Sequence, residues 1–226
     1  MAPIRLLSTL ALSGVLEVLL PRLPAGLPPV EMQLAPTNVL LERIAAGARG
    51  DIAILTDAAV DDLSASGVLD GASRVALARS HVGLAVRQGA MRPDISTAAA
   101  VAAALSGARS VALSRTGASG VFMTGLLVRL GIADEVNRRA TVIPGGLTGA
   151  RVVSGEADLA VQQMSELMAV PGLDILGRLP PEIEGLSVFT AALFTRAAPG
   201  AADVVAALRA AAALMREKGL EPVAAD

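Results

Sequence analysis

The sequence contains 226 residues, of which 53% are hydrophobic, and its formal net charge is −2. Alanine supplies much of the apolar fraction, with three Phe and neither Tyr nor Trp, so the core is expected to be aliphatic. With no basic block and no stacking platform, the composition argues against a nucleic-acid partner. Without cysteine and with His81 as the single histidine, disulfides, thiolate sites and multi-histidine metal sites are excluded, and we expect neither a metal nor a cofactor.

An apolar run at residues 6–16 follows Arg5 and resembles the hydrophobic region of a signal peptide. Glu17 interrupts it and no small-residue cleavage site follows, so we interpret it as strand, turn and helix. We therefore expect no export signal in the sequence as given, which leaves a periplasmic and a cytoplasmic location both open. No run is long enough to predict a membrane-spanning helix.

The first third of the chain alternates predicted strands with predicted helices. Strands are predicted at residues 4–7, 30–34 and 52–55, and helices at residues 13–20, 39–46 and 58–66. This order is typical of a parallel sheet covered by helices. Each strand ends in small polar residues, and ligands of such sheets gather at the carboxyl ends of the strands. These uncharged donors are Ser8, Thr9, Thr37, Asn38 and Thr56, with Thr37 or Asn38 also a candidate helix N-cap.

A second block repeats the alternation after a long extended segment, residues 74–86. A helix at 98–105 follows, with Ser96 or Thr97 as its cap. Further strands are predicted at 110–113, 141–143, 158–161 and 186–195, and helices at 147–153 and 201–218. Two long extended segments, near 75–88 and 186–196, are the candidates to join the two blocks. We predict one lobe of residues 1–82 with 187–226, and a second lobe of residues 83–186.

The stretch 114–120 combines a strand end, a turn of small residues and the start of a helix that Gly131 should end. Such a turn leaves backbone N–H groups free at the positive end of a helix dipole, which suits an anion. The simpler interpretation is that Thr116 or Ser119 only caps the helix. Arg115 lies within the turn, and we expect it to point to solvent.

Stretches 41–47, 51–57, 117–121 and 155–163 resemble type II periplasmic solute-binding proteins, closest to the molybdate-binding-like branch. The resemblance implies an α/β fold of two lobes, each a mostly parallel sheet flanked by helices, joined by two hinge strands, with the ligand in the cleft. It implies binding by hydroxyls and by N–H groups at helix N-termini. The ligand-binding residues carried over by position are Ser8, Thr9, Thr37, Asn38, Thr116, Ala118, Ser119 and Gln163.

The family resemblance implies a solute-binding protein for a small oxyanion or organic carboxylate, with an ABC-type membrane permease as partner. Lack of any tyrosine, and Thr37-Asn38 where serines are usual, argue against molybdate itself. A related branch is similar to isomerases of small unsaturated tricarboxylates such as aconitate, so an enzyme stays open as the alternative. Effector domains of some transcription regulators share this fold. No helix-turn-helix precedes the domain in this sequence, so we rank that function last. His81, on a presumed hinge strand, is expected to be a structural residue.

Overall fold

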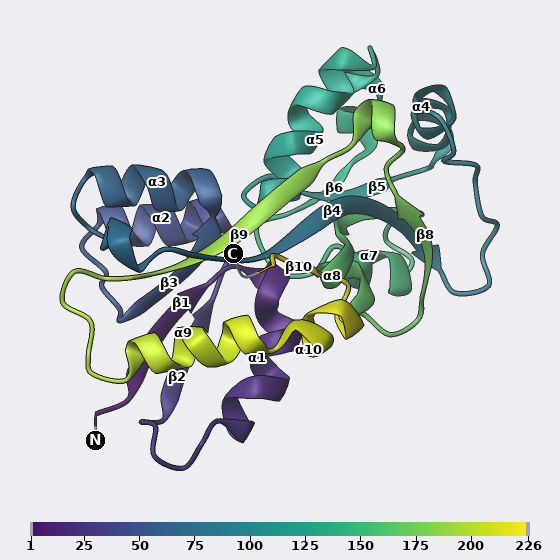
Figure 1. Cartoon of the computed structure of the whole chain (residues 1–226). Helices are drawn as coiled ribbons and strands as arrows, with labels where there is room; N and C mark the ends of the chain where they lie inside the picture. The colour runs from purple at the N-terminus through teal and green to yellow at the C-terminus, as the bar shows by residue number, and fades with distance from the viewer. Residues whose placement is uncertain (1, 225–226) are drawn as a thin grey trace. The chain divides into compact units, whose positions relative to one another are not determined.

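The computed structural model describes residues 2–224 (Figure 1). The chain divides into two compact units, one built from the residues up to Ser80 with those from Ser187 onward, the other from His81–Leu186. Two strands, β4 (Val75–Arg87) and β9 (Leu186–Leu193), run from one unit into the other. No helix within residues 2–224 combines the length and apolar character needed to cross a membrane.

The first unit is a sheet whose three parallel strands lie in the order β2-β1-β3, with β9 antiparallel on β3. Alternation in the strands sends Leu7, Ala53 and Leu55 to one face, where Leu40 and Ile44 of α2 pack on them. Helices α2 and α3 cover that face, and α1 and α9 lie on the other (Figure 1). The elements are β1 (Ile4–Ser8), α1 (Ser13–Leu19), β2 (Val30–Leu34), α2 (Thr37–Ala45), β3 (Ile52–Thr56), α3 (Asp57–Ala65), α9 (Ala201–Ala210), α10 (Ala212–Glu217) and β10 (Glu221–Pro222).

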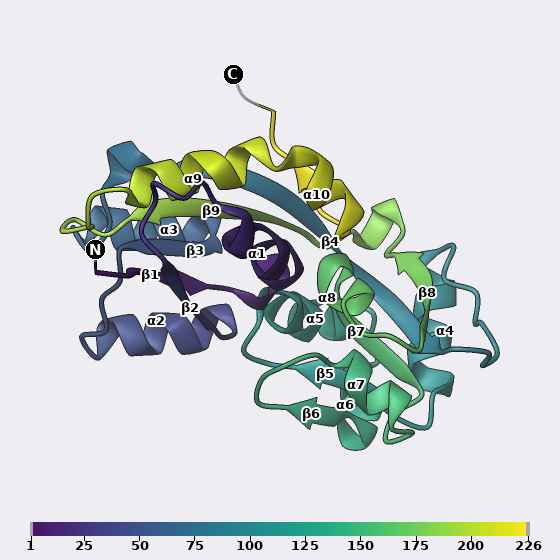
Figure 2. The same ribbon diagram turned by 90° about the horizontal axis from the view of Figure 1, so that it is seen from below.

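The second unit has three parallel strands in the order β7-β5-β6, seen side by side in Figure 2, with β4 antiparallel on β7 and β8 antiparallel on β4. Its aliphatic core joins the strands to the inner faces of α4 and α5 through Val101, Leu105, Met123 and Leu127. The elements are α4 (Ala98–Gly107), β5 (Val111–Ser114), α5 (Ala118–Arg129), α6 (Ala133–Arg139), β6 (Thr141–Ile143), α7 (Gly149–Val153), β7 (Leu159–Gln163), α8 (Met164–Met168) and β8 (Leu173–Arg178).

The two units repeat one topology. In each, the first strand of a β-α series lies in the middle, the second on one side and the third on the other, and an antiparallel strand flanks the third. The carboxyl ends of the parallel strands therefore meet at one edge of each sheet. That edge is where small ligands of such sheets bind, because the turns into the following helices converge there.

The predicted α/β fold, with mostly parallel strands and flanking helices, is confirmed, and most predicted strands match to within two residues. Three details were wrong. The helix predicted at 201–218 is two helices, because Ala211 with ψ 32° leaves the helical region. Helices α6 and α8 were not predicted. Thr37 and Asn38 are not N-caps of α2 but its first two residues, because Pro36 takes the extended N-cap position.

Asp51 links three segments of the first unit through hydrogen bonds of its side chain. Its side chain, 5% exposed, accepts hydrogen bonds from the N–H of Arg5 (2.7 Å) and of Ala198 (2.8 Å). The first bond holds the start of β1 beside β3, and the second holds the loop that leads into α9. Both hydrogen bonds are partly buried, so water replaces the carboxylate as acceptor only in part.

Replacing Asp51 by alanine should lower the free energy of unfolding by about 3 kcal/mol, because two backbone donors lose a charged acceptor. Urea denaturation followed by circular dichroism measures this. The matched control is Asp62→Ala, on the exposed side of α3, which should change stability by less than about 0.5 kcal/mol. Equal stability of the two variants would contradict the linking role of Asp51.

Candidate functional site

The strand-end edge of the first unit is built around β1, its central parallel strand. Backbone pairing continues past the strand: the N–H of Thr9 donates to Ile54 (3.0 Å) and the N–H of Ala35 donates to Ser8 (3.2 Å). Thr9 thus lies between the ends of β2 and β3. The hydroxyl of Ser8 donates to the carbonyl of Thr9 (3.1 Å), so Ser8 shapes the turn, while the Thr9 hydroxyl makes no hydrogen bond within residues 2–224.

The N-terminus of α2 opens onto the same edge. Its first intrahelical bond runs from the N–H of Leu40 to Pro36 (3.1 Å), so the N–H groups of Thr37, Asn38 and Val39 point out of the helix. The side chain of Thr37 is 4% exposed, and its Oγ1 has no hydrogen-bond partner among the described residues. Buried hydroxyls are nearly always paired, so a group of this kind calls for a ligand or a water.

The corresponding edge of the second unit carries the turn predicted from the sequence, between β5 and α5. Gly120 lets the helix approach the strand end: a Cβ there would lie 1.5 Å from the carbonyl oxygen of Ser114. The N–H groups of Gly120 and Val121 both donate to Gly117, at 3.0 and 3.1 Å. Those of Ala118 and Ser119 come before the first helical bond, and Ser119 is 3% exposed.

Three other residues of this edge have structural partners. The hydroxyl of Thr116 donates to the carbonyl of Pro144 (3.1 Å), which ties the turn to the loop after β6. The side chain of Gln163 accepts from the N–H of Glu166 in a capping box at the start of α8. Arg115 is exposed, as expected, and donates to Asn137 (3.0 Å). The ligand roles of Thr116 and Gln163 stay predictions.

The loop near Leu147 is fixed by side-chain hydrogen bonds within the second unit. The side-chain oxygen of Gln162, 2% exposed, accepts from both the N–H (2.7 Å) and the hydroxyl (2.9 Å) of Thr148. Its amide nitrogen donates to Gly146 (3.0 Å). Gln162 therefore fixes the loop that follows β6 and satisfies the start of α7 itself.

Helices α2 and α5 share a feature that sets them apart from the other described helices of eight or more residues. Neither has a side-chain cap, and neither has an acidic residue in its first turn. By contrast, α4 is capped by Thr97, α3 begins with Asp57, and α9 carries Asp203 in its first turn. An acidic first turn is the usual way to stabilise a helix N-terminus. The starts of α2 and α5 therefore have neither of the usual means of stabilising a helix N-terminus.

Asp57 places a carboxylate in the first turn of α3. Its carboxylate accepts from the hydroxyl of Thr190 (2.6 Å) and pairs with Arg74 (2.8 Å). The Thr190 bond and the Arg74 guanidinium hold the pKa of Asp57 below its ordinary value. A charged carboxylate fixed at α3 would repel an anion there, which distinguishes the start of α3 from the start of α2.

Glu166 was not singled out from the sequence, although the pattern Gln163-x-x-Glu166 is a recognisable capping box. Its side chain is 6% exposed, and one oxygen accepts from the N–H of Gln163 (3.2 Å). Burial disfavours the carboxylate and raises the pKa of Glu166 to about 7. The strand-end edge of the second unit thus holds one carboxyl that titrates near neutral pH.

His81, in the second unit, has the structural environment that we expected. Its Nδ1 lies 2.9 Å from an oxygen of Glu184, and its Nε2 lies 3.5 Å from Nη1 of Arg178. Only 9% of the residue is exposed. These contacts anchor the strand that crosses between the units.

The raised pKa of Glu166 predicts a pH-dependent stability. Between pH 4.5 and about 7 the unfolded chain has lost this proton and the folded chain has kept it, so stability falls as pH rises across that window. The total loss is on the order of 3 kcal/mol.

Glu166→Gln keeps an acceptor for the N–H of Gln163 and should remove this loss, making the variant the more stable protein at pH 8. Urea unfolding at pH 4.5 to 8 tests this; the exposed Glu182→Gln serves as control, and an unchanged pH profile in Glu166→Gln would refute the assignment.

Comparisons with known proteins agree with this architecture. Residues 29–221 match the family model described as bacterial extracellular solute-binding protein. An aconitate isomerase from Pseudomonas sp is 38% identical over 189 residues, covering 81% of this chain and 72% of that protein.

Solved structures show the same fold at low sequence identity. The periplasmic molybdate-binding protein of Azotobacter vinelandii superposes with a TM-score of 0.80 at 19% identity, covering 99% of this chain and 100% of the other. A sulfate-binding protein from Mycobacterium tuberculosis gives 0.70 at 15% identity, covering 99% and 88%. The predicted resemblance is thereby confirmed, and the chain belongs to the bacterial extracellular solute-binding protein family.

Proposed function

We propose that the protein binds a small organic carboxylate of the aconitate class, held by uncharged donors of both units. The observation that carries the proposal is the pair of helix N-termini, α2 and α5, that lack both a cap and an acidic first turn. In this proposal the lobes, residues 1–82 with 187–226 and residues 83–186, close over the ligand. The N–H groups of Thr37, Asn38, Ala118 and Ser119 and the hydroxyls of Thr9 and Thr37 form the donor set, with Ser8, Thr116 and Gln163 supporting it.

Neutral donors are sufficient for this task. A hydrogen bond to an anion contributes roughly 1.5–3 kcal/mol, and five or six such bonds support micromolar binding after desolvation costs. Fixed backbone donors also select by geometry, since each oxygen of the ligand must meet an N–H. The guanidinium of Arg115 donates to Asn137, so we do not include it in the donor set.

The choice of an organic carboxylate over a metal oxyanion follows from the relatives. The aconitate isomerase is 38% identical, whereas the molybdate-binding protein is 19% identical. The chain also has no tyrosine, the residue that molybdate binders of the resembled branch often place at the ligand. An ABC-type permease is the membrane partner that the family suggests for a binding role.

The second candidate function, favoured by the same relative, is isomerisation of aconitate. Its cis and trans forms interconvert when a base takes a proton from the methylene carbon next to the double bond and an acid returns one at the other end of the allylic anion. Efficient bases have a pKa near the working pH. Glu166, with a pKa of about 7 at the strand-end edge of the second unit, is the residue we propose for this proton transfer.

A thermal-shift series separates the ligand classes. We expect cis- or trans-aconitate to stabilise the protein by about 2.7 kcal/mol at 100 times the dissociation constant, and molybdate and sulfate to have little effect. Stabilisation by molybdate or sulfate alone would contradict the proposed ligand class. Proton NMR of each pure aconitate isomer with the protein then decides between binder and isomerase, because only an enzyme produces the other isomer.

Ser119→Asp should weaken aconitate binding at least about 100-fold, because it sets a like charge at the start of α5. The matched control is Ala99→Asp, which adds the same charge at the second residue of α4, where Thr97 already caps the helix. Isothermal titration calorimetry should show the control within a factor of about two of the parent. Equal affinity in the two variants would remove α5 from the site.

Thr37→Val tests the first unit in the same assay. It keeps the shape of the side chain and removes the unpartnered hydroxyl, so affinity should fall at least about tenfold. Thermal unfolding of each variant without ligand controls for misfolding. Unchanged affinity would mean that the Thr37 hydroxyl faces something other than the ligand.

A further inference from the structure

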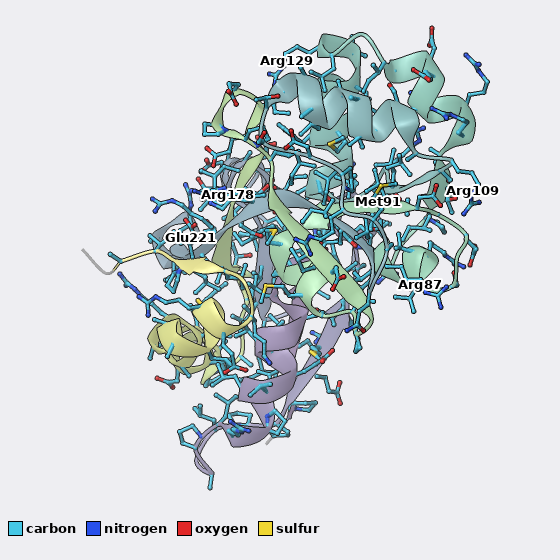
Figure 3. All side chains as sticks on the ribbon, turned by 90° about the vertical axis from the view of Figure 1, so that its right-hand side faces the viewer. Arg87, Met91, Arg109, Arg129, Arg178 and Glu221 are labelled. Atoms are coloured by element: carbon cyan, nitrogen blue, oxygen red, sulfur yellow. The ribbon has the colours of Figure 1, made fainter. Side chains whose placement is uncertain are left out.

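The second unit contains a pocket that the proposed function does not use. Its volume is about 610 Å³, within the range of small-molecule sites. Its walls come from the end of β4 and the segment after it, from the outer side of α4, and from the turn between α7 and β7. Figure 3 shows Arg87, Met91 and Arg109 along this side of the unit.

Strand direction separates this pocket from the candidate anion site. It is lined by Arg109, which precedes β5, and by Asp158 and Leu159 at the start of β7. The candidate site lies at the opposite ends of these parallel strands, after Ser114. Four strand residues at about 3.3 Å each place the two sites roughly 13 Å apart along the strand. One small ligand therefore does not reach both.

The pocket exists because α4 presents small side chains to it. Val101 and Leu105 of this helix are buried in the core, whereas Ala103, Ala104 and Gly107 line the pocket. Larger residues at these positions would fill the space. The other walls are mainly aliphatic, so the interior favours an apolar ligand.

Met91 lies at this pocket with 91% of its surface exposed, the most exposed large hydrophobic residue described. A flexible thioether at the rim of an apolar pocket adapts to ligands of different shape. Covering Met91 and the alanines would remove apolar surface from water, which supplies a driving force for binding.

The two arginines that line the pocket differ in whether a carboxylate pairs with them. Arg109 is neutralised by Asp158, to which its side chain donates at 2.9 Å and its N–H at 2.8 Å. Arg87, also in the lining, makes no side-chain hydrogen bond or ion pair within residues 2–224. The pocket thus joins an aliphatic interior to one uncompensated guanidinium, which recognises a carboxylate well.

We propose that this pocket binds a small amphipathic carboxylate, a medium-chain fatty acid in chemical class, with its chain along α4 and its carboxylate on Arg87. The site is separate from the anion site of the proposed function and does not depend on it.

Decanoate is the probe, and calorimetry on the full chain is the assay. We expect one saturable site. Affinity should fall roughly three- to fourfold for each CH₂ removed on going to octanoate and hexanoate. Decanol, which has no carboxylate, should bind at least about tenfold more weakly than decanoate.

Two variants with matched controls place the site. Ala103→Leu fills the pocket and should abolish binding, whereas Ala99→Leu, on the same helix outside the lining, should not change it. Arg87→Gln should weaken decanoate at least about tenfold and leave decanol unchanged, whereas the exposed Arg138→Gln should change neither.

Absence of saturable decanoate binding would overturn the proposal, as would binding that Ala103→Leu leaves intact. Equal binding of decanol and decanoate would refute the role of Arg87. Sedimentation velocity is run in parallel: self-association of the protein lost in Ala103→Leu would show instead that a second copy covers this surface. Aconitate affinity unchanged in Ala103→Leu keeps the result independent of the anion site.

Discussion

The N–H groups at the starts of α2 and α5, which no cap or carboxylate satisfies, are the feature on which the proposed function depends. A helix leaves its first N–H groups without an internal partner, and proteins usually supply a cap or a carboxylate. Here α3, α4 and α9 follow that habit, and α2 and α5 do not. Both exceptions begin at strand-end edges, where the topology of each unit gathers its turns. The positive dipole ends of α2 and α5 therefore lack the side-chain partners that the other three helices have.

The fold makes this arrangement possible through close packing of small residues. Gly120 brings the start of α5 onto the carbonyl of Ser114, where even a methyl group would not fit. Gln162 and Thr116 then hold the neighbouring loop through bonds to Thr148 and Pro144. Polar residues of these edges thus divide into those that hold the turns and those, such as Thr37, whose side chain has no hydrogen-bond partner among the described residues. A core without Tyr or Trp suits this design, because aliphatic side chains let helices lie close to the sheet.

Much of the fold follows from the sequence because the strands are short apolar runs that end at small polar residues. The donor positions Thr37 and Ser119 follow from the same pattern, since a residue after a strand of a parallel sheet must lie at its edge. The position of Thr37 within α2 could not be predicted from the sequence. Threonine is a common N-cap residue, and only the backbone conformation shows that Pro36 is the N-cap. The sequence also does not show which polar side chains are buried. Glu166, whose pKa depends on desolvation, was therefore not identified from it. For the same reason, the sequence does not distinguish Gln162, which holds a loop, from a residue that contacts a ligand.

Backbone amide NMR during a titration with trans-aconitate observes the N–H groups at the starts of α2 and α5 themselves. We expect the amide signals of Thr37, Asn38, Ala118 and Ser119 to move together with one dissociation constant, while that of Ala99 at the capped α4 stays in place. Movement confined to one unit, or to residues away from the starts of α2 and α5, would contradict this expectation.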